Sequence, residues 1–141
     1  MAKPKMLILC TGNSARSQMA EAFMRRYAGD RFDVYSAGLE PKGLNPLTVR
    51  VMEEIGYDLS GARSKDVAEF LGYYNFGTII TVCANAEARC PIFPGVSTRL
   101  YWPFDDPAAV EGTEEEKLAV FRRVRDELDA RVREWVVEGG G

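Results

Sequence analysis

Four short segments rich in apolar and β-branched residues recur along this chain and predict strands, and the first of them has the continuity expected of a strand buried on both faces. They cover residues 5–10, 32–37, 77–82 and 98–102. The stretches between them are longer, and several show the apolar spacing of helices. We expect helices at residues 16–27, 46–55 and 65–70, and from Thr113 onward. Strands that alternate with helices predict right-handed crossovers and hence a three-layer α/β sandwich, with a four-stranded parallel sheet and helices on both faces.

Capping residues mark where two helices begin. Asn45 before Pro46 combines an N-cap with a proline at the first helical position, and Thr113 with Glu116 forms a capping box. The inward face of the Asn45 helix is expected to carry Val49, Met52 and Ile55. The 141 residues contain no repeat or linker, so we expect a single domain over residues 1–141, frayed at the glycines 139–141.

The composition excludes several classes of function. A formal net charge of −3 argues against nucleic acid or an acidic membrane surface as a partner. The first apolar run is too short for a signal peptide or a membrane span, so we expect a cytoplasmic protein. Without histidine, the chain lacks Cys-His and Ser-His-Asp catalysis and most zinc sites. Three cysteines in a reducing compartment are expected to be catalytic or redox groups.

The segment Cys10-Thr11-Gly12-Asn13-Ser14-Ala15-Arg16-Ser17 joins the first predicted strand to the first predicted helix. Gly12 and Asn13 tolerate a positive φ, so the loop can turn its backbone N–H groups toward one centre. The helix N-terminus adds positive potential there, and Arg16 offers two parallel N–H donors to an oxyanion. Such surroundings favour the thiolate form of a cysteine. The segment therefore predicts a nucleophile in an oxyanion-binding loop; a small buried apolar Cys10 is the alternative.

Cys83 and Cys90 enclose an alanine-rich stretch that favours a helix. In an intact helix their Cα atoms would be about 10 Å apart, whereas a disulfide needs about 4.4 to 6.8 Å. A bond between them requires the segment to unwind, which Pro91 and the small alanine side chains make feasible. The pair favours a redox switch. Two unrelated buried thiols or a metal pair are the alternatives, and the lack of histidine disfavours zinc.

Cys10, Cys83 and the pair Asp105-Asp106 each follow the carboxyl end of a predicted strand, so we expect them at one edge of the sheet. Together with Cys90, Ser36-Ala37-Gly38, Asn45-Pro46 and residues 102–107, they resemble the thioredoxin-coupled arsenate reductase family, whose fold is that of the low-molecular-weight protein tyrosine phosphatases. The resemblance extends over nearly the whole chain.

This resemblance implies a role for each matching residue. Cys10 would be the nucleophile, Asp106 the general acid, and Cys83 and Cys90 the resolving cysteines, while the Ser17 hydroxyl would bond to the thiolate. The oxyanion would be bound by Arg16 and by the loop amides of Thr11, Gly12, Asn13, Ser14, Ala15 and Arg16. The implied reaction proceeds through a Cys10–Cys83 and then a Cys83–Cys90 disulfide, which thioredoxin reduces.

The resemblance also raises the question of a metal ion. It implies no tightly bound cofactor, but some members hold potassium with residues matching Asn13, Glu21 and Ser36 and with an aspartate. Here Lys65 follows Ser64 at the place of that aspartate. Either Asp66 substitutes for it or the Lys65 ammonium occupies the ion's site, and the sequence leaves both open.

Arsenate and phosphate are nearly the same tetrahedral oxyanion, so the neighbours of the loop must decide between reduction and phosphate hydrolysis. Phosphatases of this fold hold the substrate ring between aromatic side chains, but residues 39–47 and 108–110 contain none. This favours arsenate reduction, with slow phosphatase side activity. A tyrosine phosphatase and a non-catalytic oxyanion or redox sensor are the alternatives. The expected partners are arsenate or phosphate and thioredoxin, with neither nucleic acid nor membrane, and the chain is expected to be monomeric.

Overall fold

The computed structural model describes residues 3–139, and its four strands form one parallel sheet. The strands are β1 (Lys5–Cys10), β2 (Asp33–Gly38), β3 (Thr78–Thr81) and β4 (Thr98–Tyr101). Their order across the sheet is β2-β1-β3-β4, and in the register Leu7 of β1 lies beside Tyr35 of β2 and Ile79 of β3. The chain therefore reverses its direction of travel across the sheet between β1 and β3, which is where α/β sheets bind ligands.

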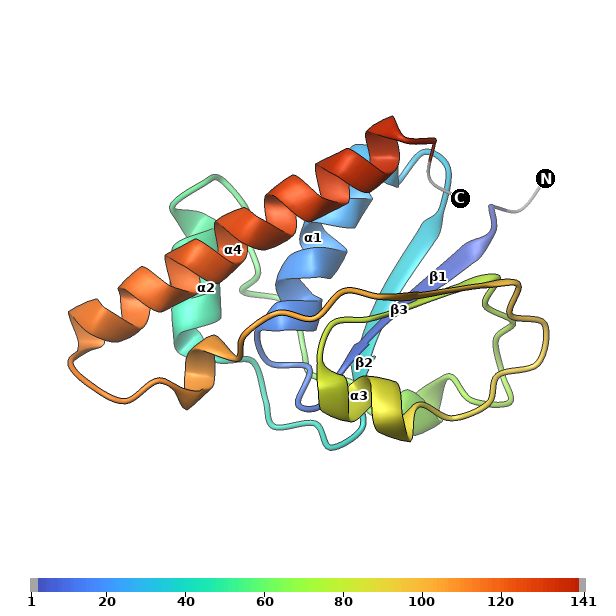
Figure 1. The fold of residues 1–141 in the computed structure, drawn as a ribbon, viewed down its shortest axis with the longest axis horizontal. Helices are drawn as coiled ribbons and strands as arrows, with labels where there is room; N and C mark the ends of the chain where they lie inside the picture. Colours follow the sequence, from blue (N-terminus) through green and yellow to red (C-terminus); the bar gives the residue numbers. More distant parts are fainter. Residues whose placement is uncertain (1–2, 140–141) are drawn as a thin grey trace.

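Within residues 3–139, four α-helices and two single 3-10 turns accompany the strands; all but the last two, η2 and α4, lie between strands along the chain (Figure 1). They are α1 (Arg16–Ala28), α2 (Pro46–Glu53), η1 (Val67–Glu69), α3 (Ala84–Arg89), η2 (Pro107–Ala109) and α4 (Glu114–Val137). Because β2 and β4 lie on opposite sides of the β1–β3 pair, right-handed crossovers place α1 and α3 on opposite faces of the sheet. Helix α4 returns to pack on α1 and α2. The predicted three-layer α/β sandwich is confirmed.

The core is built around β1, which is covered on both faces. Its residues 6–9 are fully buried, as is Phe23 of α1. Side chains alternate along β2: Ser36 bonds to Glu21 of α1, and the preceding Tyr35 lies on the other face. There Tyr35 packs in an aromatic cluster with Phe70, Tyr74, Phe76 and Phe93. The two faces are thus filled by different elements, α1 with α4 on one side and the 67–93 region on the other.

Two local predictions need correction. The helix expected over residues 65–70 is only the turn η1, because the Lys65 carbonyl accepts from the Gly38 amide and the helix cannot begin before the Asp66 cap. Ile55, expected to face inward, is 39% exposed because α2 ends at Glu53. The fraying predicted for residues 140–141 lies outside the described residues. None of the helices within residues 3–139 is both long and apolar enough to cross a membrane.

Candidate functional site

The loop after β1 is held in shape by backbone contacts with the end of β2. Asn13 adopts φ 48°, the left-handed conformation that asparagine tolerates better than most residues. Gly38 lies so close to the loop that an added Cβ would be 2.7 Å from the Thr11 carbonyl oxygen and 2.9 Å from the Asn13 nitrogen. A glycine at the end of β2 is therefore required for the loop to lie where it does.

The thiol of Cys10 lies inside this loop and is 3% exposed. The backbone N–H of Asn13 donates to Cys10 Sγ over 3.2 Å, and the hydroxyl of Ser17 lies 2.9 Å from the same sulfur. The Asn13 amide in turn donates to Ser17 Oγ over 2.7 Å. These contacts hold the Cys10 sulfur within the loop. The predicted contact between Ser17 and Cys10 is present.

A cavity of about 80 Å³ opens beside Cys10 at the carboxyl end of β1. Its lining residues are Cys10, Thr11, Gly12, Ser14, Ala15, Arg16, Lys42, Asp106 and Ala108. We call this the oxyanion cavity. Of the predicted loop residues, Asn13 does not belong to the lining set, because its positive φ directs its side chain behind the loop, toward Ser36. The cavity is small and polar, as a site for an inorganic oxyanion should be.

Arg16 and Asp106 meet at this cavity. Arg16 begins α1, is 12% exposed, and its Nη2 lies 3.8 Å from Asp106 Oδ2. Its Nη1 also donates to the Phe104 carbonyl over 3.0 Å, which fixes the guanidinium. Asp106 caps η2 by accepting from the Ala108 N–H. The neighbouring Asp105 is 75% exposed and pairs instead with Arg123 of α4 over 3.1 Å. Only Asp106 of this pair of aspartates lines the oxyanion cavity.

Cys83 lies between β3 and α3 and is 4% exposed. It is the N-cap of α3, and its Sγ accepts from the Ala86 N–H over 3.4 Å. Thr11 belongs to the loop of residues 10–17, which we call the oxyanion loop. It connects the Cys83 thiol to the cavity, because its hydroxyl lies 3.5 Å from Cys83 Sγ. Asn85 of α3 donates to the same hydroxyl over 2.8 Å. Cys83 and the loop of Cys10 are thus brought together at one edge of the sheet, as predicted.

Cys90 lies at the opposite end of α3, as its C-cap, and all three cysteines are free thiols. The six-residue helix between Cys83 and Cys90 keeps them apart, so a bond between them requires α3 to unwind. Cys90 is half-buried, and this burial raises the pKa of its thiol, with Glu87 adding to the rise and Arg99 opposing it. Unwinding that exposes Cys90 would therefore also favour its reactive thiolate.

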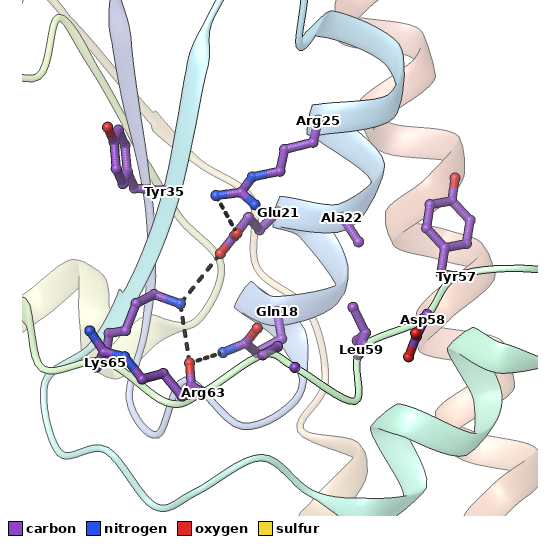
Figure 2. A pocket seen from close by; sticks show the side chains of 12 residues that line it. Gln18, Glu21, Ala22, Arg25, Tyr35, Tyr57, Asp58, Leu59, Arg63 and Lys65 are labelled. Carbon is purple, nitrogen blue, oxygen red and sulfur yellow. Dashed lines mark hydrogen bonds and ion pairs between the residues drawn. The ribbon is translucent and has the colours of Figure 1, made fainter.

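The residues considered for potassium form a network of donors and acceptors, in which Glu21 lies between Arg25 and Lys65 (Figure 2). Glu21 accepts from Ser36, pairs with Arg25 at 2.9 Å, and lies 3.6 Å from the ammonium of Lys65. The Asn13 side-chain oxygen accepts from the Lys65 N–H over 2.9 Å. Lys65 already engages the Glu21 and Asn13 oxygens, and the Ser36 hydroxyl is bonded to those two side chains, so the set does not fit potassium as it stands. Asp66 is not available as a substitute, because its carboxylate caps η1.

Comparison with known proteins places these features in a family. Residues 5–138 match the family described as low molecular weight phosphotyrosine protein phosphatase. This chain belongs to that family. The arsenate reductase of Halalkalibacterium halodurans is 48% identical over 139 residues, covering 99% of each chain. A solved arsenate reductase in a phosphate binding state has a TM-score of 0.80 at 30% identity, covering 96% of this chain and 98% of that one.

A thioredoxin-dependent arsenate reductase of Corynebacterium glutamicum is also similar in structure, with a TM-score of 0.67 and 26% identity. The match covers 96% of this chain and 61% of that one. The resemblance to arsenate reductases that the sequence indicated is thus confirmed, and it extends over almost the whole chain.

Three residues of the site were missed by sequence analysis. Lys42 and Ala108 line the oxyanion cavity, and Gln18 donates to the Asn13 carbonyl and side-chain oxygens over 3.2 and 3.1 Å. The segments 39–47 and 108–110 were expected beside the loop only from the family resemblance, and nothing in their local sequence gave Lys42 or Ala108 a role in the cavity. Gln18 had a local signal, since it directly follows the loop and lies in the first turn of α1. As a polar residue in an amphipathic helix it would be expected to face solvent, yet it is 3% exposed.

Proposed function

We propose that this member of the low molecular weight phosphatase family reduces arsenate to arsenite, with thioredoxin as the reductant. One observation carries the proposal: a thiol in a small oxyanion cavity lies at the same sheet edge as a second thiol, with a third across a short helix. Hydrolysis of a phosphate ester needs only the first of these thiols. A two-electron reduction of arsenate also needs a partner thiol, because the two electrons come from two thiols that join in a disulfide. The arsenate reductases similar to this chain support the same function.

The first step joins sulfur to arsenic. The Cys10 thiolate attacks arsenate bound by Arg16 and the loop amides, and an oxygen leaves from arsenic as Asp106 protonates it. The position of Asp106 supports its role as acid, because it lines the cavity and lies beside Arg16. The product is a covalent adduct in which arsenic is still in the +5 state.

The second and third steps are displacements at sulfur. The Cys83 thiolate attacks Cys10 Sγ, so that a disulfide forms, the sulfur–arsenic bond breaks, and its electron pair leaves on arsenic as arsenite. The Cys90 thiolate then attacks Cys83 Sγ, which forms the Cys83–Cys90 disulfide and releases the Cys10 thiolate. Unwinding of α3 accompanies this third step, because its ends must approach. Thioredoxin reduces the final disulfide by the same exchange chemistry.

A slow phosphatase activity is the second candidate function. A nucleophilic thiol, an oxyanion-binding loop and a general acid suffice to form and hydrolyse a phosphoryl-cysteine. A small aryl phosphate should therefore react. The lining of the oxyanion cavity argues against tyrosine phosphate as the main substrate, because among the described residues it contains no aromatic side chain to stack on a phenyl ring. A purely non-catalytic oxyanion or redox sensor would have no need of the acid Asp106 at the cavity.

We further propose that potassium is not required, because the Lys65 ammonium supplies the positive charge beside Glu21. Activity in potassium chloride and in sodium chloride of equal ionic strength should agree within about twofold, the range of weak salt effects on exposed charges. Activation by potassium alone would contradict this role of Lys65. Dependence on reduced thioredoxin suits the cytoplasm, where thiols are kept reduced, and we propose that compartment. The monomeric state stays a prediction.

Mass mapping of disulfides after one turnover tests the proposed function. The reduced chain is mixed with one equivalent of arsenate, quenched in acid with an alkylating agent, and digested. We expect a peptide pair joined through Cys83 and Cys90, with Cys10 alkylated. The Cys90→Ser variant should stop one step earlier and yield a Cys10–Cys83 pair. Arsenate incubation that leaves all three thiols alkylated, in a folded protein, would contradict arsenate reduction.

A further inference from the structure

Lys42 lines the oxyanion cavity beside Arg16 and Asp106, yet it has no role in the steps above. We propose that Lys42 is a second oxyanion-binding cation, which binds the doubly charged inorganic oxyanion together with Arg16. The inference rests on the proposed function and deepens it, because it concerns the substrate of the same site. It follows from the backbone position, the packing and the charge of this one lysine.

The backbone of Lys42 is fixed to the oxyanion loop itself. The segment after β2 runs alongside that loop: Leu39 N–H donates to the Cys10 carbonyl at 3.3 Å, and three more backbone hydrogen bonds follow. They are Glu40 N–H to the Thr11 carbonyl at 2.8 Å, Lys42 N–H to the Gly12 carbonyl at 3.0 Å, and Asn45 N–H to the Ser14 carbonyl at 3.1 Å. The Cα of Lys42 is therefore held at a set distance from the groups that bind the oxyanion.

The aliphatic stem of Lys42 lies across Gly12. A Cβ added to Gly12 would be 3.3 Å from Lys42 Cδ and 3.4 Å from its Cγ. Because Gly12 has no side chain, the aliphatic part of Lys42 can pack directly on the Gly12 backbone. This packing runs the Lys42 side chain along the cavity. Gly12 does not adopt the positive φ that its residue type allows, so this packing is the use that the structure gives it, since a larger residue there would press on the lysine.

The ammonium of Lys42 is not engaged by a carboxylate. Among the described residues, no ion pair within 4 Å involves it, and the nearby Glu40 instead binds Arg89 of α3 at 2.9 Å. The hydrogen bond and the charge of Arg89 are the main causes that lower the pKa of Glu40, and Lys42 adds a smaller effect. Arg16, in contrast, already donates to the Phe104 carbonyl. Lys42 is therefore the cation of this cavity with the most unused binding capacity.

The charges in the reacting complex call for such a group. A thiolate and a dianionic phosphate or arsenate bring three negative charges into a cavity of about 80 Å³. Arg16 supplies one positive charge, and the N-terminus of α1 adds roughly half a charge. A second full positive charge reduces the repulsion between the thiolate and the incoming dianion, which raises the affinity for substrate. Because both the bound and the reacting oxyanion feel this charge, we expect an effect on KM more than on kcat.

Inorganic phosphate is the probe, because it has the charge and shape of arsenate but is not reduced. Its dissociation constant is measured by calorimetry on the reduced full chain, on Lys42→Met and on Lys42→Arg, with Lys117→Met of α4 as a matched loss of charge outside the site. We expect Lys42→Met to weaken binding about tenfold, and Lys42→Arg and Lys117→Met to stay within about threefold of the parent. Arsenate KM should rise in Lys42→Met with kcat changed less than about threefold.

The outcomes separate this inference from the function on which it rests. Equal phosphate affinity of the parent and of Lys42→Met, with a normal circular dichroism spectrum, would overturn the role of Lys42 and leave arsenate reduction standing. A tenfold loss in Lys117→Met as well would also overturn it, since the effect would then come from net charge. A parent chain that binds neither phosphate nor arsenate would overturn the proposed function itself, and the role of Lys42 with it.

Discussion

Removing Cys10 and removing Cys83 should have different consequences, although both thiols are buried at the same sheet edge. Cys10→Ser should abolish arsenate reduction and hydrolysis of aryl phosphate alike, because both begin with attack by this sulfur. Cys83→Ser or Cys90→Ser should abolish only multiple-turnover reduction, since hydrolysis of a phosphoryl-cysteine needs no second thiol. Steady-state assays with both substrates measure the difference. A folded Cys83→Ser protein without phosphatase activity would show that Cys83 is more than a resolving thiol.

The two adjacent aspartates offer a matched pair of substitutions. Asp106→Asn should slow turnover of an aryl phosphate by about 10²- to 10⁴-fold, the range of general acid catalysis, because Asp106 lines the oxyanion cavity. Asp105→Asn should have little effect, because that side chain is 75% exposed and pairs with Arg123 away from the cavity. Comparison of kcat for the two variants decides between them, and a larger defect in Asp105→Asn would reverse the assignment.

The local part of the site could be predicted from the sequence, and the distant part could not. Cys10, Arg16 and Ser17 belong to one loop, whose residue types and spacing already imply a turn around an anion. Lys42 reaches the same cavity only because β1 pairs with β2 and their following segments run side by side. A contact set by strand pairing and by the missing side chain of Gly12 has no signature in the sequence near Lys42.

Among the elements, the strands were predicted closely from their apolar and β-branched residues and the long helices from their apolar stripes, whereas short helices depend on tertiary contacts. Helix α3 shows this dependence most clearly. It has only six residues, and contacts from outside hold it: Arg99 of β4 donates to the Glu87 carbonyl at 3.0 Å, Arg89 pairs with Glu40, and Asn85 donates to Thr11. A helix stabilised in this way can be released by chemistry at its ends.

Oxidation should therefore loosen α3 and leave the sheet intact. In amide hydrogen exchange, we expect the protection factors from Ala84 to Arg89 to fall by about tenfold or more in the oxidised protein, as local unfolding would cause. Those of Thr78–Thr81 in β3 should change little. The comparison is made on reduced protein and on protein whose Cys83–Cys90 bond is confirmed by mass. If α3 were equally protected in both states, no unwinding would accompany disulfide formation, although the relay chemistry could still hold.

For the molecule as a whole, stability should depend on pH mainly in the acid range. The chain has no histidine, so no side chain with an ordinary pKa near 6.5 is present. In contrast, Glu54 stabilises the packing of α4 on α2. It follows α2 and accepts hydrogen bonds from two arginines of α4, Arg122 at 2.6 Å and the buried Arg125 at 2.9 Å. These bonds, first the one from Arg122, lower the pKa of Glu54 from 4.5 to about 2.

A carboxyl whose pKa is lower in the folded than in the unfolded chain stabilises the fold above its unfolded pKa. The contribution of Glu54 should thus be complete above about pH 5 and disappear as the pH falls from 4.5 to about 2. Glu54→Gln should lower Tm at pH 7 by about a few degrees, with the difference from the parent closing toward pH 2.

Thermal unfolding followed by circular dichroism between pH 2 and pH 8 measures this dependence, with Glu53→Gln as the control. Glu53 is an exposed carboxylate at the end of the same helix, and within residues 3–139 it takes part in no ion pair within 4 Å, so its removal should leave Tm unchanged at every pH. A Tm difference between Glu54→Gln and the parent that stays constant down to pH 2 would mean that lost packing, and not the charge of Glu54, fastens α4 to α2.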